Sequence, residues 1–193
     1  MKNNLTLYSA FLVIGLILAC CSVSGGENPI ETKLVTTTPE ESVYIPPDFI
    51  LPPAELNIPA PKFTATDLTG KKVSPADLQD QVVMLNVWAT WCPPCQHEMP
   101  VLEAYYQAHK HTDFVIVGVN WEDNQKEIES FIEEYSLSFL FWMDTDLDAR
   151  RVLNKPPMPC SYIIDRGGNL RLRWIGEVDL EALETYVTPL LEE

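Results

Sequence analysis

The feature that most constrains this chain is a pair of closely spaced cysteines at the boundary between two different sequence patterns. The pentapeptide Trp91-Cys92-Pro93-Pro94-Cys95 follows the mostly apolar segment 81–88 and precedes the segment 96–103. The first segment has the composition of a buried strand, and the second is typical of a helix. A C-x-x-C sequence at a strand-to-helix junction indicates a dithiol redox site. We therefore expect the fold to be built around this junction.

The spacing predicts different roles for the two cysteines. Cys92 would lie at the start of the helix, where unpaired N–H groups and the helix dipole favour an anion. This lowers the pKa of the thiol, and the thiolate is the reactive nucleophile. Cys95 lies one turn further on the same face, where it can attack a mixed disulfide formed at Cys92. Pro93 and Pro94 are tolerated, because first-turn N–H groups have no intrahelical partner to lose.

Other interpretations of the cysteine pair fit the sequence less well. A structural zinc site needs about four ligands, whereas the chain has three histidines, His97, His109 and His111, and no second C-x-x-C. We therefore expect no bound metal and no cofactor. A pair of buried, inert cysteines is the remaining alternative.

Composition limits the classes of partner. The net charge of −15 argues against nucleic acid or an anionic membrane surface as a charge-driven partner. Solubility is a sufficient explanation for this charge. A length of 193 residues with 46% hydrophobic residues suits one domain with a real core plus an appendage.

The first 20 residues have the pattern of a secretory signal. Lys2 precedes an apolar run from Leu5 to Ala19, which is short for a membrane span. The run ends Ile17-Leu18-Ala19-Cys20, which resembles the lipobox of bacterial lipoproteins and implies lipidation of Cys20. Cys21 offers a second register, and an uncleaved signal anchor is the alternative. Each case places the domain outside the cytoplasm and close to a membrane.

Residues 21–58 are expected to form a tether. They contain Gly25-Gly26, Pro46-Pro47 and Pro52-Pro53 and few periodic apolar residues. Such a composition buries too little surface to fold alone, and its prolines stiffen it toward polyproline II.

Residues 59–193 are expected to form one α/β domain. The pattern predicts a mixed central sheet flanked by helices, because strand–helix–strand order is followed by a hairpin and a last helix. The expected strands are 62–66, 72–74, 82–88, 113–120, 137–142, 162–164 and 170–174, and the expected helices are 93–108, 128–135, 146–153 and about 180–190.

This domain resembles the TlpA/ResA-like group of extracytoplasmic thiol–disulfide oxidoreductases. The matching pieces are the segment 85–95, Glu98-Met99-Pro100, Gly118-Val119-Asn120 and Pro159 followed by 162–165. The resemblance implies a thioredoxin-like fold with an N-terminal β-hairpin extension. It also implies a membrane-tethered enzyme that reduces disulfides of extracytoplasmic proteins, with cytochrome c maturation as the commonest context. A membrane thiol-reducing electron donor would regenerate the dithiol.

The resemblance also implies roles for residues around the cysteines. Thioredoxins carry a buried Asp where this chain has Asn86, which cannot act as a base. The group uses an acid soon after its Val-Asn pair instead, and Asp123 fits that spacing better than Glu122. Their amide variants are therefore expected to slow the reductase step. Two solvated loop acids are the alternative.

Further site residues follow from the same resemblance. Pro159 matches the cis-proline of the group, and Met158 before it would offer its backbone to a substrate strand. An ordinary turn proline is the alternative. Trp91, Pro93 and Pro94 of the motif complete the expected substrate-binding residues.

Cys160 stands where the group usually has Thr. Since a free Cys behaves as a small hydrophobe, we expect a Cys92–Cys95 disulfide with Cys160 reduced and nonessential. A bridge from Cys160 to Cys92 or Cys95, with a three-thiol mechanism, is the alternative.

Two other functions remain open from the sequence. The first is a chaperone for copper or another soft metal that uses the C-x-x-C thiolates. The second is a non-catalytic lipoprotein whose cysteines only form a structural disulfide.

Overall fold

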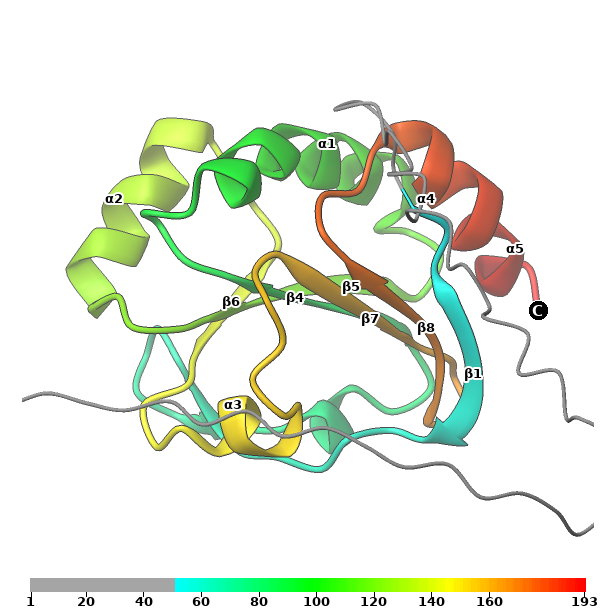
Figure 1. Ribbon diagram of the computed structural model, residues 1–193, viewed down its shortest axis with the longest axis horizontal. Helices are drawn as coiled ribbons and strands as arrows, with labels where there is room; N and C mark the ends of the chain where they lie inside the picture. Colours follow the sequence, from blue (N-terminus) through cyan, green and yellow to red (C-terminus); the bar gives the residue numbers. More distant parts are fainter. Residues whose placement is uncertain (1–50) are drawn as a thin grey trace, which may run out of the picture. The chain divides into compact units, whose positions relative to one another are not determined.

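The computed structural model describes residues 51–193, and these residues contain an eight-stranded mixed sheet (Figure 1). The strand order is β1-β8-β7-β4-β5-β6-β2-β3. The strands are β1 (Ala54–Pro59), β2 (Ala65–Asp67), β3 (Lys72–Val73), β4 (Val82–Trp88), β5 (Phe114–Asn120), β6 (Leu140–Met143), β7 (Cys160–Ile164) and β8 (Asn169–Ile175). The helices are η1 (Pro75–Leu78, a 3₁₀ turn), α1 (Pro93–His109), α2 (Gln125–Tyr135), α3 (Asp148–Val152), α4 (Leu180–Tyr186) and α5 (Thr188–Leu191).

Helices cover both faces of the sheet. The helices α1, α2, α4 and α5 lie on one face, and α3 and η1 lie on the other (Figure 1). Every residue of the central strands β4, β5 and β7 is buried. This explains why these strands are nearly continuous apolar runs, because a sheet covered on both sides has no solvent-facing positions. The predicted mixed α/β fold is confirmed.

The centre of the sheet places the cysteine pair. β4 pairs in parallel with β5 and antiparallel with β7. Its last residue, Trp88, lies beside Asn120 at the end of β5, and the residue before it, Val87, lies beside Cys160 at the start of β7. The loop that leads from β4 to Cys92 therefore meets the ends of both neighbouring strands.

The helix α2 shows how local sequence sets an element. Asn124 caps its start by accepting a hydrogen bond from the N–H of Glu127, whose carboxylate accepts from the N–H of Asn124 in return. Ser136, in the left-handed conformation, ends the helix. Ile128 and Phe131 form its buried side, as the apolar periodicity predicts.

The sheet begins earlier in the chain than predicted. The predicted tether, 21–58, runs into the edge strand β1, which pairs antiparallel with β8. Only Leu56 of this strand is even partly buried. Its sequence alternates apolar residues (Ala54, Leu56 and Ile58) with polar ones (Glu55 and Asn57), but the prolines on both sides of this segment favoured a tether. The predicted hairpin extension is present, since β2 pairs antiparallel with β3.

The predictions for the N-terminal segment lie outside the described residues. These are the signal at residues 1–20, the lipidation of Cys20 and the part of the tether before Leu51. Within residues 51–193, no helix is both long and apolar enough to cross a membrane.

Candidate active site

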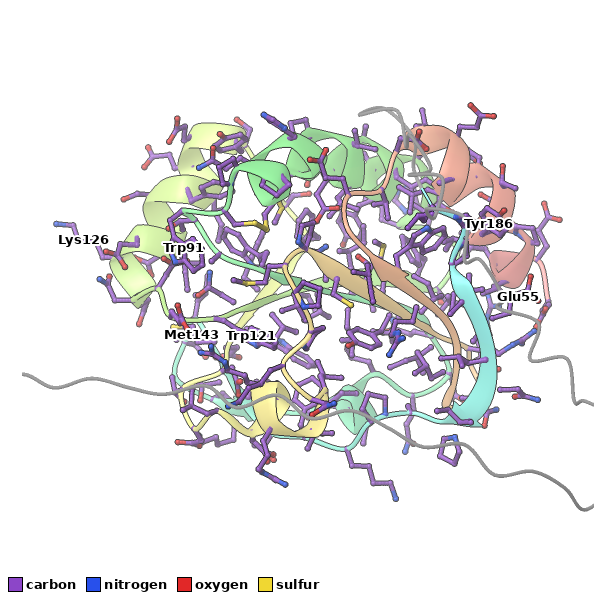
Figure 2. All side chains as sticks on the ribbon, viewed as in Figure 1. Glu55, Trp91, Trp121, Lys126, Met143 and Tyr186 are labelled. Atoms are coloured by element: carbon purple, nitrogen blue, oxygen red, sulfur yellow. A yellow bond between two sulfur atoms is a disulfide. The ribbon has the colours of Figure 1, made fainter. Side chains whose placement is uncertain are left out.

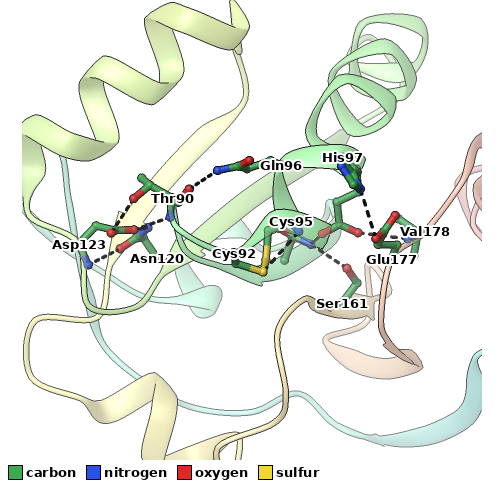
Figure 3. The surroundings of a disulfide bond; sticks show 12 residues. Thr90, Cys92, Cys95, Gln96, His97, Asn120, Asp123, Ser161, Glu177 and Val178 are labelled. Atoms are coloured by element: carbon green, nitrogen blue, oxygen red, sulfur yellow. Dashed lines mark hydrogen bonds and ion pairs between the residues drawn. A yellow bond between two sulfur atoms is a disulfide. The ribbon is translucent and has the colours of Figure 1, made fainter.

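Cys92 and Cys95 form a disulfide at the start of α1 (Figure 3). Their Cα atoms lie 5.3 Å apart. Cys92 is the N-cap residue, and its Sγ accepts a hydrogen bond from the N–H of Cys95 at 3.3 Å. The Cys92 sulfur therefore lies where the unpaired N–H groups of the first turn stabilise a negative charge.

The two cysteines of the disulfide differ in their accessibility. Cys92 exposes 4% of its surface and Cys95 none. Trp91, directly before Cys92, is 56% exposed. It lies in the loop that leads into α1, on the side of the domain that carries α2 (Figure 2). Only Cys92 can therefore be approached from outside the protein.

The loop before Cys92 is held by a hydrogen-bonded clamp. Asp123 accepts from the N–H and from the hydroxyl of Thr90, both at 2.7 Å. Asn120 orients the Asp123 carboxylate, because its Nδ2 donates at 2.7 Å and its Oδ1 accepts from the N–H of Asp123. The carbonyl of Thr90 accepts from Gln96 Nε2 at 2.6 Å. All three polar groups of Thr90 are thus tied to neighbouring elements (Figure 3).

A buried carboxylate lies on the opposite side of the dithiol. Glu98 follows Cys95 by one helical turn on the same face of α1 and is 1% exposed. Its Oε1 accepts from Asn86 Nδ2 at 2.7 Å, and its Oε2 accepts from the N–H of Val178 at 3.1 Å. Glu98 thereby joins α1 to β4 and to the segment between β8 and α4.

Burial raises the pKa of the Glu98 carboxyl to about 8. The hydrogen bonds from Asn86 and Val178 favour the charged form and oppose this rise, and the negative charge of Glu177 adds to it. Glu98 can therefore take up and release a proton near neutral pH, next to a cysteine that must do the same.

The β7 side of the site is formed by the loop before this strand. The Met158–Pro159 peptide bond is cis, as predicted, and Pro159 is buried while Met158 is partly exposed. The carbonyl of Pro159 accepts from the N–H of Gly176. Ile175, beside Cys160 in the sheet, is 49% exposed and adds an apolar side chain at this end of the sheet.

Cys160 is a free, fully buried thiol that lies across the sheet from the disulfide. Its neighbour Ser161 accepts a hydrogen bond from Asn86 on the α1 side, so strand alternation directs Cys160 to the other side. Cys160 packs in the apolar cluster on that side, whereas Cys92 and Cys95 belong to the cluster beneath α1. Burial raises the pKa of the Cys160 thiol.

The two acids expected to handle protons have other partners in the structure. Asp123 belongs to the Thr90 clamp, and Glu122 forms a surface ion pair with Arg150. Their assignment to proton transfer stays a prediction. No role for Glu98 follows from the motifs, although the sequence carries a signal for one. Glu98 shares the helix face of Cys95 and Leu102, and an acid on a buried face needs an explanation.

Metal ligands are not clustered in this part of the chain. Among residues 51–193, no three His, Cys, Asp or Glu side chains lie close enough together to hold a metal ion.

Comparison with known proteins identifies the class. Residues 56–173 match the model of the AhpC/TSA family. The chain is 34% identical to the thiol-disulfide oxidoreductase ResA of Bacillus cereus over 128 residues, which are 66% of this chain and 74% of that protein. It is 32% identical to ResA of Bacillus subtilis over 111 residues, 58% of this chain and 62% of that protein.

Solved structures show the same fold. StoA from Bacillus subtilis has a TM-score of 0.57 at 28% identity, covering 67% of this chain and 98% of that one. A secreted Mycobacterium tuberculosis disulfide oxidoreductase homologous to E. coli DsbE has a TM-score of 0.59 at 26% identity, covering 66% and 95%. The protein is a thiol–disulfide oxidoreductase of thioredoxin-like fold. It belongs to the AhpC/TSA family and is similar to its ResA members, as the sequence motifs indicated.

The buried Glu98 predicts an unusual pH dependence of stability. The unfolded chain releases this proton near the ordinary pKa of 4.5, and the folded protein retains it up to about pH 8. The folded state therefore binds more protons across this window, and the free energy of unfolding falls as pH rises through it. We expect Glu98→Gln, with the disulfide intact, to reduce this fall by on the order of 3–5 kcal/mol.

Urea denaturation at pH 5 and pH 8.5 measures this effect. Glu134→Gln, at an exposed position on α2, is the matched control. Its free energy of unfolding should fall between pH 5 and pH 8.5 by as much as that of the wild type. If the free energy of unfolding fell equally with pH in the wild type and in Glu98→Gln, Glu98 would be ionised in the folded protein across the whole range.

The Thr90 clamp gives a second prediction. Asp123→Asn replaces one acceptor oxygen by an amide donor, which then opposes a donor of Thr90 or Asn120. We expect a loss of about 1–3 kcal/mol in stability and a lower reductase rate at every pH, with an unchanged pH profile. Glu122→Gln removes only a surface pair and should cost less than about 1 kcal/mol. A shifted pH–rate profile for Asp123→Asn would instead support Asp123 as the proton carrier.

Proposed function

We propose that this oxidoreductase reduces disulfides of extracytoplasmic proteins, with Cys92 as the attacking thiolate and Cys95 as the resolving thiol. The observation that carries this proposal is the asymmetry of the pair. Cys92, the N-cap of α1, exposes 4% of its surface, and Cys95, one turn further on, exposes none. A substrate sulfur can reach the first and not the second.

The reaction begins from the reduced dithiol. The Cys92 thiolate attacks one sulfur of the substrate disulfide, the substrate S–S bond breaks, and its other sulfur leaves as a thiolate that takes a proton from water. The product of this step is a mixed disulfide between Cys92 and the substrate.

Resolution requires that Cys95 lose its proton. We assign the acceptor role to the Glu98 carboxylate, one turn along α1, which forms the acid as the Cys95 thiolate forms. Cys95 then attacks the Cys92 sulfur, the mixed disulfide breaks, and the second substrate sulfur leaves as a thiolate that is protonated by water. Two electrons pass from the enzyme dithiol to the substrate, and Cys92–Cys95 becomes the disulfide.

The substrate-binding surface surrounds Cys92. Trp91 and the exposed Pro93 offer apolar contacts beside the sulfur. Pro94 belongs to the same rim, and Met158 before the cis-proline offers backbone groups to an extended substrate segment. Such a rim fits an unfolded or flexible polypeptide that presents a disulfide at its surface.

The N-terminal sequence supports a location outside the cytoplasm. The signal-like residues 1–20 and the lipobox-like ending at Cys20 support a lipid anchor, and the Pro-rich residues from 21 onward support a tether between membrane and domain. A membrane thiol-reducing donor would then regenerate the dithiol. Apocytochrome c during cytochrome c maturation is the substrate context that the ResA-like sequence supports.

The roles of the cysteines can be tested by trapping. Cys95→Ser should accumulate mixed disulfides through Cys92, because the resolving thiol is missing. Cys92→Ser should trap nothing, since the buried Cys95 is not reached by substrates. Cys160→Ser in the Cys95→Ser background is the control and should trap as much, because Cys160 lies across the sheet. Non-reducing gels and peptide mapping give the result; trapping by Cys92→Ser alone would reverse the assignment.

The direction of electron flow gives a further prediction. A reductase requires a Cys92/Cys95 reduction potential close to that of thioredoxin, about −270 mV, rather than that of the oxidant DsbA, about −120 mV. Equilibration with glutathione or dithiothreitol buffers and quantification of the free thiols measure this potential. A value near that of DsbA would make the protein an oxidase and overturn the reductase proposal.

A further inference from the structure

The side-chain amide of Asn86 is incompletely paired in the core of the site. Its Nδ2 donates both hydrogens, one to Glu98 Oε1 at 2.7 Å and one to Ser161 Oγ at 3.1 Å. Its Oδ1 is buried and has no hydrogen-bond partner. A buried amide that satisfies one end and leaves the other unpaired has lost part of its hydrogen-bonding energy.

This arrangement suits only one protonation state of Glu98. Both carboxylate oxygens accept N–H donors, Oε1 from Asn86 and Oε2 from Val178. The backbone N–H of Val178 can only donate, whereas the side-chain amide beside Oε1 also has an acceptor atom, so Oε1 is the oxygen on which a proton can find a partner in this network. That proton would then face the Nδ2–H of Asn86, and two donors would oppose each other.

A half-turn of the amide removes this conflict. We propose that Asn86 is a two-position switch whose amide orientation follows the protonation of Glu98, with the hydroxyl of Ser161 as its pivot. With Glu98 ionised, Nδ2 donates to Oε1 and to Ser161. With Glu98 protonated, Oδ1 takes the place of Nδ2 and accepts from the Oε1–H group and from the Ser161 hydroxyl. The proton moves between Glu98 and Cys95 or water, and Asn86 itself gains or loses none.

Ser161 is suited to the pivot because a hydroxyl both donates and accepts. It lies directly opposite Asn86 in the β4–β7 pairing, so its distance to the amide is fixed by the sheet. Ser161 is fully buried, so bulk water does not compete for its hydroxyl in either arrangement. We therefore assign Ser161 and Asn86 as positioning residues that act through Glu98.

Other titratable groups surround this network and must be held constant in a test. Repulsion by Glu177, which is paired with His97 at 3.7 Å, acts on Glu98, and Glu98 in turn acts on Cys160. In the reduced enzyme the Cys92 and Cys95 thiols titrate nearby as well. The disulfide form removes these two thiols, so the switch is best examined there.

The role of this switch in catalysis rests on the proposed function. It lets Glu98 hold the proton of Cys95 without a second donor facing that proton. It can nevertheless be observed without turnover. Nitrogen and carbon NMR of the full chain with the disulfide intact would follow the Asn86 side-chain NH₂ and the Glu98 carboxyl carbon from pH 5 to 10. We expect both signals to titrate with one common midpoint.

Two variants of Ser161 separate the pivot from a structural role. Ser161→Ala leaves an Nδ2–H of Asn86 unpaired when Glu98 is ionised, whereas the protonated arrangement still pairs Oδ1. The Glu98 midpoint should therefore rise by about half a unit to one unit, the size of one neutral hydrogen bond. Ser161→Thr retains the hydroxyl and should retain the wild-type midpoint.

Each outcome decides the proposal. An Asn86 signal that stays constant through the Glu98 midpoint overturns the switch, and so does a Ser161→Ala variant that unfolds at lower temperature with an unchanged midpoint. A common midpoint together with failure of the Cys95→Ser trap would support the switch and refute the proposed function. The two failures are therefore distinguishable.

Discussion

The buried carboxylate of Glu98 is the constraint on which the active site depends. A group of this kind is stable in the core only if its oxygens are paired, and here the donors come from Asn86 on β4 and from the backbone of Val178 after β8. These two segments and α1 are thereby fixed in relation to one another. The same burial that requires these partners also brings the carboxyl pKa to about 8, where it is useful for proton transfer.

Two acidic residues near the disulfide, Asp123 and Glu98, differ in their exposure and in the number of hydrogen-bond donors around them. Asp123 is partly exposed and accepts three hydrogen bonds from Thr90 and Asn120, which hold the loop before Cys92. Glu98 is enclosed and has fewer donors, so its charge is costly and its proton is exchangeable near neutrality. Asp123 therefore holds the loop that positions Cys92, and Glu98 lies one helical turn from Cys95 with a pKa that allows proton exchange near neutral pH.

The central sheet also separates the three thiols of the domain. Alternation along β7 places Ser161 on the α1 side with the disulfide and Cys160 on the opposite side. The sheet lies between Cys160 and the two active-site sulfurs, and Cys160 packs in the other apolar cluster. Ser161, one residue further, is brought into the Asn86 network by the same alternation.

The sequence by itself determined the strand-to-helix junction at Cys92, the mixed sheet and the helix α2, because apolar periodicity and the C-x-x-C spacing are local properties of the chain. It also indicated the family through these motifs. Only the tertiary structure decided that Glu98, rather than Asp123, meets Asn86, that Ser161 shares their face, and that β1 extends the sheet. These contacts join residues 12 to 119 positions apart, and their partners are set by strand register and burial, which no local pattern encodes.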